Sequence, residues 1–344
     1  MIQEPSKSSD PWEVIVIGGG LAGLSAGLYL GRSKRRTLLI ESGHSMAVWE
    51  PDVENYLGFP NGISGEDLLR RGHEQSARHD VQFMRDEIVA MQRDEHGFLL
   101  QGQRDRYTAE RVLLATGMTH IPPDIPEVRA CLGRSLFFCK DCDGYRVQGG
   151  RIGIIGRNNE AVKYAVGMLI YSSAVIVATN GEKTAWDQRH ADLLAEYRIP
   201  VYDERVIDVT HAQGRIQSIR FHNGPQVAID YLFATRGDLC HNELARSLGA
   251  RLNTDGEIEV DEHMRTSVTG LYAAGCVTPA NCQMIIAAGQ GASAAQAIHH
   301  DLFEEALRTH SLRQYREMQL RHSVTEPLIL DEHSAPHRSP VTDE

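Results

Sequence analysis

Three glycines directly behind a short apolar segment restrict the possible fold more than any other feature of this chain. Residues 12–17 read WEVIVI, a short β-branched run that predicts a buried strand. Gly18, Gly20 and Gly23 follow it in the spacing Gly-x-Gly-x-x-Gly. Glycines at this spacing permit a tight turn, close approach of a pyrophosphate and close packing of helix on strand. The pattern therefore predicts a βαβ unit that binds a dinucleotide at the N-terminus of its helix.

An acidic residue at the right distance supports this prediction. A helix is expected to end near Leu30, and residues 36–40 then predict a second strand. Glu41 follows that strand, 18 residues beyond Gly23, where an acid holds the ribose hydroxyls of a bound dinucleotide. Strand, helix and acid are thus all present in the required order.

A pair of cysteines separated by two residues predicts redox chemistry. Cys139 and Cys142 lie just before a strand-like run at residues 151–155, and two intervening residues allow a small-loop disulfide. Half of a zinc site is the alternative, but the sequence has no second Cys-x-x-Cys to complete it. Asp143 follows directly, and a carboxylate there can relay a proton to the dithiol. Its alternative role is a helix cap or turn residue.

Composition and charge indicate how many domains the chain has, where it is located and which partners it can have. A length of 344 residues predicts two domains, and no segment approaches the roughly 18 apolar residues of a membrane span. The polar first ten residues lack a secretory signal, so a reducing, cytoplasmic location is expected. A net charge of −11 argues against nucleic acid as a partner. The basic cluster at residues 32–36 is expected to be a solvated face, with docking of an acidic protein as the alternative.

Together these motifs resemble a known family. Residues 115–117 read Ala-Thr-Gly and residues 266–275 read TSVTGLYAAG. With the glycine fingerprint, Glu41 and the Cys-x-x-Cys-Asp-Gly segment, the chain looks like a low-molecular-weight thioredoxin reductase from about residue 12 to about residue 307. The resemblance implies an α/β fold of two Rossmann-like (FAD/NAD(P)-binding, three-layer) domains, the second inserted in the first.

The expected domain boundaries follow from that resemblance and from a proline-rich linker near residue 123. Residues 1–10 are expected to form a disordered arm. The FAD-binding domain is expected to be discontinuous, with residues 11–122 and 245–310, and the inserted dithiol domain with a degenerate NADPH-like site is expected at residues 123–244. Residues 311–344 are expected to form a mostly flexible tail. An alternative role for the tail is to cover the flavin face that nicotinamide would occupy, as C-terminal segments do in some ferredoxin-linked relatives.

The resemblance also assigns roles to individual residues. Cys142 is expected to face the flavin, Cys139 to exchange with a partner protein and Asp143 to handle the proton. A helix starting near Gln283 is expected to direct its positive end at the flavin, which stabilises the anionic reduced ring. Residues expected to bind FAD are Gly18, Gly20, Leu21, Ala22, Gly23, Glu41, Asn55, Thr116, Gly117, Gly275, Cys276, Gln283, Met284 and Ile285.

The inserted domain departs from the family where it should bind NADPH. Asn158 stands at the position of the second fingerprint glycine, and its Cβ would obstruct a pyrophosphate. Glu160 adds a negative charge, and residues 179–182 read TNGE where NADP-dependent relatives have basic residues. NADPH is therefore not expected as a cofactor, and NAD is doubtful for the same steric reason.

The remaining cysteines depart from the pattern on the flavin side. Cys276 replaces an aspartate that accepts a hydrogen bond from the flavin ribityl chain in the family, and a thiol is a weak acceptor. Cys276 and Cys282 could pair, but free thiols are expected in a reducing compartment. The same expectation holds for Cys131 and Cys240. No metal site is predicted, since His333 and His337 lack partner ligands.

The predicted function is a FAD-dependent disulfide oxidoreductase that passes electrons between flavin and the Cys139–Cys142 disulfide. A thioredoxin-like protein is the expected partner, and a homodimer the expected assembly. The donor is predicted to be ferredoxin or a second flavin. The alternatives are a FAD-dependent dithiol oxidase that uses oxygen, an NADPH-dependent thioredoxin reductase with an atypical nucleotide site, and a flavin-binding scaffold without activity.

Overall fold

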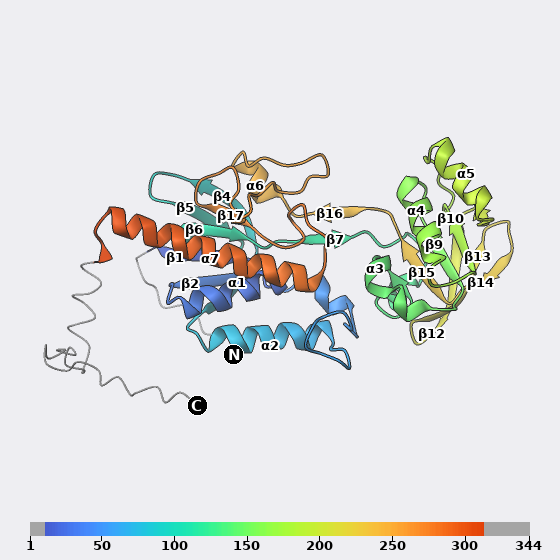
Figure 1. Ribbon diagram of the computed structural model, residues 1–344, viewed down its shortest axis with the longest axis horizontal. Helices are drawn as coiled ribbons and strands as arrows, with labels where there is room; N and C mark the ends of the chain where they lie inside the picture. Colours follow the sequence, from blue (N-terminus) through green and yellow to red (C-terminus); the bar gives the residue numbers. More distant parts are fainter. Residues whose placement is uncertain (1–10, 313–344) are drawn as a thin grey trace, which may run out of the picture. The chain divides into compact units, whose positions relative to one another are not determined.

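The computed structural model describes residues 11–312, and two mainly parallel sheets organise most of them (Figure 1). Within this range the first sheet has seven strands in the order β3-β2-β1-β6-β5-β4, with β17 beside β6. Its strands are β1 (Trp12–Ile17), β2 (Thr37–Glu41), β3 (Gln82–Arg85), β4 (Ile88–Arg93), β5 (Phe98–Gly102), β6 (Arg106–Leu114) and β17 (Leu271–Ala273). Strand β1 lies in the middle, parallel to both β2 and β6.

The centre of this sheet is apolar because its strands are covered on both faces. Val14, Ile15 and Val16 of β1 are fully buried, as expected for a parallel strand that reads as a continuous hydrophobic run. Strands β4 and β5 extend the sheet as an antiparallel meander from β6. Because β1, β2, β6 and β17 run parallel to one another, their carboxyl ends meet at one edge of the sheet, where ligands of such folds bind.

Helices and one 3₁₀ turn complete this part of the chain. They are α1 (Leu21–Arg32), η1 (Met46–Trp49), α2 (Gly65–Ala77), α6 (Glu243–Ser247) and α7 (Met284–Arg308). Ser64 is the N-cap of helix α2, and its hydroxyl accepts a hydrogen bond from the backbone N–H of Asp67. It packs on α1, where the buried Ser76 hydroxyl donates to the carbonyl of Leu24.

The second sheet is formed by strands that lie between β6 and β17 in the sequence. Its order is β11-β10-β9-β15-β8, all parallel. The strands are β8 (Leu136–Phe137), β9 (Ile152–Ile155), β10 (Val175–Ala178), β11 (Val201–Tyr202) and β15 (Tyr231–Ala234). The helical segments are η2 (Val128–Cys131), α3 (Lys140–Asp143), η3 (Tyr145–Val147), α4 (Asn159–Met168) and α5 (Gln188–Glu196).

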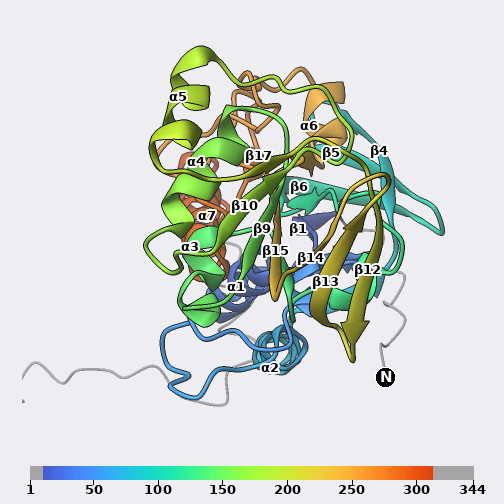
Figure 2. The same cartoon turned by 90° about the vertical axis from the view of Figure 1, so that its right-hand side faces the viewer.

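A small antiparallel sheet covers the face of the second sheet opposite α4 and α5 (Figure 2). It consists of β12 (Val206–Ala212), β13 (Arg215–Phe221) and β14 (Gln226–Ala228). Each face has its own core: Ile154 packs with Ala161 and Val162 of α4, whereas Ile155 packs with residues of β12 and β13. The arrangement is helix layer, parallel sheet and antiparallel sheet, a three-layer Rossmann-like unit.

Two short strands carry the chain from the first sheet into the second and back. Strand β7 (Met118–His120) follows β6, β16 (Asp238–Cys240) follows β15, and the two pair antiparallel. The Thr116 hydroxyl donates to the carbonyl of His241 at 2.7 Å beside this ribbon. Because the chain completes the first sheet only after building the second, the second unit is inserted in the first.

The predicted fold class, α/β with two Rossmann-like domains, is confirmed. The expected helices and strands are present with small shifts, as for α1, which was expected to end near Leu30 and ends at Arg32. The expectations for the arm and for nearly all of the tail concern residues outside 11–312, as do His333 and His337. Within the described range, no helix is both long enough and apolar enough to span a membrane.

Candidate active site

One cavity brings most of the predicted site residues together at the carboxyl edge of the first sheet. Its wall includes the loops after β1, β2, β6 and β17 and also the Cys139–Cys142 segment. The predicted residues on this wall are Gly18, Gly20, Leu21, Ala22, Glu41, Asn55, Thr116, Gly117, Cys139, Cys142, Asp143, Gly275, Cys276, Gln283 and Met284. Gly23 and Ile285 are not among the lining residues, and Ile285 is 42% exposed in the first turn of α7.

Gly18 and Gly23 are required by packing between the chain's own atoms. Gly18 has a positive φ of 116°, and a Cβ there would lie 2.1 Å from the carbonyl oxygen of Ala115. A Cβ on Gly23 would lie 1.9 Å from the carbonyl oxygen of Gly18. Any larger residue would therefore force α1 away from the turn after β1.

Gly20 serves a different purpose, because the space around it is open. It is the N-cap of α1, and a Cβ there would meet only the Ser45 hydroxyl, at 3.7 Å. No side chain caps the helix, and its first turn contains no acid. The free N–H groups of this turn are thus available to an anion, and the helix dipole favours negative charge there. This arrangement fits the pyrophosphate of FAD.

Glu41 lies where a dinucleotide ribose would need an acceptor. It is the last residue of β2, beside the glycine turn, and its carboxylate is 3.4 Å from the imidazole of His73 on α2. A Cβ on Gly19 would overlap this carboxylate, at 1.9 Å from Oε2. The acid is therefore held directly against the phosphate-binding turn, as the ribose contact requires.

The Cys139–Cys142 pair forms a disulfide on the wall of the same cavity, with Cα atoms 5.3 Å apart. Cys139 is the N-cap of the short helix α3, which places Cys142 one turn later. Phe138 positions this turn: its ring stacks on His120 at 4.6 Å, and its carbonyl accepts a hydrogen bond from Tyr164. The disulfide thus lies on the wall of the cavity that the glycine turn after β1 also lines.

Gln283 connects the disulfide to the start of α7. Its Nε2 donates to Sγ of Cys142 at 3.1 Å and lies 3.4 Å from Sγ of Cys139. Its Oε1 accepts a hydrogen bond from the amide of Asn55 at 3.0 Å, which fixes the orientation of the side chain. An amide donor in this position would stabilise negative charge as it develops on Cys142 when the disulfide opens.

Asp143 is a buried acid with a strongly perturbed ionisation. The residue is only 5% exposed, and Arg146 donates to its Oδ1 at 3.2 Å. Burial, aided by the nearby charge of Glu50, raises the pKa of Asp143 to about 7 despite the opposing effect of Arg146. Burial also raises the pKa of Glu50. A carboxyl group with a pKa near neutrality is suited to exchanging protons with the adjacent thiols.

Replacing Asp143 with asparagine is expected to remove a pH-dependent cost to folding. The pKa in the folded protein, about 7, lies above the usual value of an unfolded aspartate, so the native state binds more protons between about pH 4 and pH 7. The contribution of Asp143 to stability is therefore present at low pH and lost as pH rises through 7. Across this window, the free energy of unfolding of Asp143→Asn should rise relative to wild type by up to about 4 kcal/mol.

The measurement is chemical unfolding of both FAD-loaded proteins at pH values from 4.5 to 8. Asp230→Asn is a useful control, because a hydrogen bond from Arg151 holds the pKa of Asp230 below its usual value. Its stability difference from wild type should stay nearly constant over this range, because Asp230 titrates below pH 4.5 in both the folded and the unfolded state. A difference for Asp143→Asn that does not depend on pH would contradict the assignment.

Cys276 and Cys282 form a second disulfide, with an S–S distance of 2.05 Å and Cα atoms 4.9 Å apart. The expectation that both are free thiols was therefore wrong. It rested on the compartment alone, whereas the turn between β17 and α7 folds back and places the two side chains together. Both residues line the cavity. Cys131 and Cys240 are free thiols, as expected.

The corresponding turn of the second sheet is capped by the chain itself. Asn158 is the N-cap of α4, and its Oδ1 accepts a hydrogen bond from the backbone N–H of Ala161 at 3.2 Å. Glu160 lies in the first turn. Next to this turn, Glu182 pairs with Arg157 at 2.9 Å and with Arg236 at 2.7 Å. The first-turn backbone N–H groups, which are free at α1, are thus partly occupied at α4.

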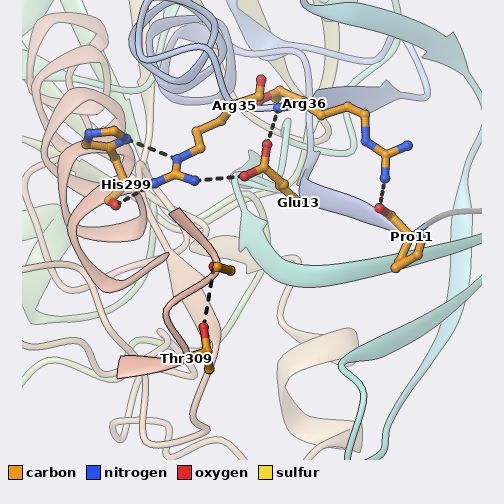
Figure 3. A network of polar contacts seen from close by, with 8 residues as sticks. Pro11, Glu13, Arg35, Arg36, His299 and Thr309 are labelled. Carbon is orange, nitrogen blue, oxygen red and sulfur yellow. Dashed lines mark hydrogen bonds and ion pairs between the residues drawn. The ribbon is translucent and has the colours of Figure 1, made fainter. Parts of the chain in front are cut away.

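The basic cluster at residues 32–36 makes several contacts within the chain (Figure 3). Arg35 pairs with Glu13 at 2.8 Å and also donates to His299 at 3.0 Å. Glu13 accepts a second hydrogen bond from the backbone N–H of Arg36, and the Arg36 guanidinium bonds to the carbonyl of Pro11. Much of this charge therefore stabilises the chain itself and is less available to a partner.

Several residues of the site were not predicted from the sequence. Glu50, Arg146, His241 and Cys282 all line the cavity. Arg146 had a local signal, because its spacing of three from Asp143 favours contact within a helical turn. Glu50 and His241 had none, since only the tertiary fold brings them to this edge. Among the described residues, no cluster of three or more potential metal ligands exists.

Comparisons with known proteins agree with this geometry. Residues 12–299 match the family described as pyridine nucleotide-disulphide oxidoreductase. The chain is 26% identical over 318 residues to thioredoxin reductase of Bacillus subtilis, which covers 87% of this chain and 98% of that protein. A solved structure of TrxB from Bacillus anthracis is 30% identical, with a TM-score of 0.78, and covers 86% of this chain and 99% of that one.

The structure of HlmI superposes with a TM-score of 0.83 at 26% identity, and it covers 92% of this chain and 100% of that one. The family match spans the glycine turn, the disulfide and the first turns of α7 together. The sequence-based prediction of the enzyme class is confirmed. The chain belongs to the pyridine nucleotide-disulphide oxidoreductase family, and it is a flavin-dependent thiol–disulfide oxidoreductase.

Proposed function

We propose that this enzyme passes electrons between bound FAD and the Cys139–Cys142 disulfide and on to a thioredoxin-like protein, with a donor other than NADPH. The observation that carries the proposal is the position of this disulfide, on the wall of the cavity that the uncapped N-terminus of α1 also lines. The thioredoxin reductases among the relatives support a thioredoxin-like partner. A homodimer and a cytoplasmic location stay predictions.

The chain's own residues account for the handling of charge and protons. FAD, when bound, would supply a two-electron carrier in the cavity that Cys142 also lines. Gln283 then stabilises the sulfur of Cys142 as it becomes a thiolate, and Asp143 supplies or accepts the proton. Cys139 is the sulfur left for attack on the partner's disulfide. Rotation of the inserted unit about the β7–β16 ribbon would expose it, as the resemblance to thioredoxin reductases implies.

The contrast between the two glycine turns favours a donor other than NADPH. At α1 the first-turn N–H groups have no side-chain cap, whereas at α4 the Asn158 side chain already accepts one of them. A pyrophosphate at α4 would have to displace this cap and would lie near Glu160 and Glu182. Ferredoxin or a second flavin remains as the proposed donor.

Anaerobic mixing with NADPH tests this proposal directly. The flavin absorbance of the enzyme should stay unchanged for minutes after mixing with a hundredfold excess of NADPH or NADH, because neither nucleotide has a site. Dithiothreitol, which needs only the Cys139–Cys142 pair, should bleach the same sample and serves as the positive control. Rapid bleaching by NADPH would reject the proposed absence of a nucleotide site.

Counting flavins separates the two proposed donors. One FAD per chain, released by denaturation and measured by absorbance, favours a ferredoxin, whereas two flavins per chain favour an internal second flavin. The intrachain contacts of Arg35 and Arg36 leave Arg32 and Lys34 as the exposed basic residues of the 32–36 cluster that an acidic ferredoxin could contact. Oxygen consumption with small dithiols that disappears in Cys142→Ser would instead support the dithiol oxidase.

A further inference from the structure

The Cys276–Cys282 disulfide lies in the turn that leads from the first sheet into α7. Both cysteines are half-buried and line the cavity that also contains Cys139 and Cys142. The bond therefore faces the site of chemistry and remains accessible to small reagents. Neither cysteine is part of the Cys139–Cys142 reaction proposed above.

The position of this bond is poorly suited to a purely structural role. It closes a loop with a sequence separation of only six, and the stabilisation from a cross-link falls as the loop becomes shorter. Thr278 already ties the loop together, since its hydroxyl donates to the carbonyl of Gly275 at 2.8 Å and lies 3.1 Å from Oε1 of Gln290. In a reducing compartment, the location that the sequence predicts, disulfides that form are usually catalytic or redox-sensing.

Gln283 joins the two disulfides. It is bonded to Cys282 through the peptide chain, while its side-chain amide donates to Sγ of Cys142 at 3.1 Å. A single residue thus links the two sulfur pairs. Cys282 also lies two residues before the first residue of α7, where the helix dipole favours a thiolate and makes Cys282 a good leaving group.

We propose that Cys276–Cys282 is a second redox-active disulfide, which receives two electrons from the Cys139/Cys142 dithiol by thiol–disulfide interchange. The thiolate of Cys142 attacks Sγ of Cys282, which forms a Cys142–Cys282 bond and releases Cys276 as a thiolate. Cys139 then attacks Cys142, which restores the Cys139–Cys142 disulfide and releases Cys282. Two protons from the first pair end on the second, so atoms and electrons balance. The inference rests on the dithiol chemistry proposed above but not on the identity of the donor.

Trapping the intermediate tests this interchange. In Cys139→Ser/Cys276→Ser, the thiols of Cys142 and Cys282 lose their usual partners. Mild oxidation of the FAD-loaded protein with oxidised glutathione should then join them in most chains, as detected by non-reducing peptide mass mapping. In Cys139→Ser/Cys282→Ser, the same treatment tests whether Cys142 forms a disulfide with Cys276.

The free thiols of Cys131 and Cys240 are internal controls, because burial raises the pKa of each and they should stay unpaired. A disulfide from Cys142 to either cysteine of the second pair, well above any link to Cys240, supports the proposal. If neither variant forms such a bond, the proposal is overturned.

A kinetic measurement decides the question if the double variants fail to fold. The wild-type enzyme is treated anaerobically with three equivalents of dithiothreitol, enough for two electrons to each disulfide and to FAD, and alkylation at successive times counts thiols in each cysteine peptide. Thiols at Cys276 and Cys282 should appear at least tenfold faster than in Cys139→Ser/Cys142→Ser, which lacks the relay. Equal rates overturn the second redox centre. If the first pair is reduced and the flavin bleaches while Cys276–Cys282 stays oxidised, the second centre fails but the proposed function stands.

Discussion

Cys142→Ser is expected to abolish electron transfer between thiols and flavin, with a loss of at least ~10³-fold in rate, as for removal of a catalytic nucleophile. Cys142 is the sulfur that Gln283 contacts most closely, and it lines the cavity together with the turn that fits FAD. Without it, the disulfide with Cys139 cannot form, and the remaining Cys139 thiol cannot complete a two-electron cycle. The FAD content should stay at the wild-type value, because the α1 turn is unchanged.

Dithiothreitol provides an assay that does not require the natural donor. The variant and the wild type are mixed anaerobically with excess dithiothreitol, and the decay of the flavin absorbance gives the rate. Cys240→Ser is the matched control: burial and nearby acids raise the pKa of Cys240 to about 11, so it is a poor nucleophile and its loss should leave the rate unchanged. Bleaching of Cys142→Ser at the wild-type rate would show that electrons reach the flavin by another route.

Gly20→Asp is expected to weaken FAD binding at least ~100-fold while the protein stays folded, because two or more charge-assisted hydrogen bonds to the pyrophosphate would be lost. The backbone of Gly20 is extended, with φ −77° and ψ −175°, so an aspartate is accommodated without strain. As an N-cap, aspartate would accept from the free N–H groups and repel a phosphate. The substitution thereby reproduces at α1 the capped state that Asn158 creates at α4.

Two other glycines provide controls for this variant. Gly23→Ala places a Cβ 1.9 Å from a backbone oxygen and should unfold or displace α1, with loss of both FAD and stability. Gly289→Ala, inside α7 with no atom near its added Cβ, should keep FAD and gain up to about 1 kcal/mol of stability. Fluorescence titration of FAD-free protein gives the affinity, and circular dichroism reports the fold. Unchanged FAD affinity in Gly20→Asp would contradict the assignment of the phosphate site.

Local patterns carried most of what could be predicted about the fold. The apolar run of β1, the glycines behind it and Glu41 at the end of β2 lie within about one βαβ unit, so short-range spacing was sufficient. The strand boundaries were nearly right for the same reason: β1 was predicted over residues 12–17, as found. The domain insertion required the family resemblance, because nothing in residues 118–120 by itself reveals a return strand at 238–240.

For the chemistry of the pocket, the sequence and the tertiary structure also determined different things. The sequence alone determined which residue types were present: a dithiol, an acid beside it, one intact glycine turn and one with Asn158 in place of glycine. The tertiary structure decided how they act. It paired Cys276 with Cys282, brought Glu50 to Asp143 and set Gln283 against Cys142. Ionisation and exchange depend on burial and on contacts between distant segments, and these exist only after the chain has folded.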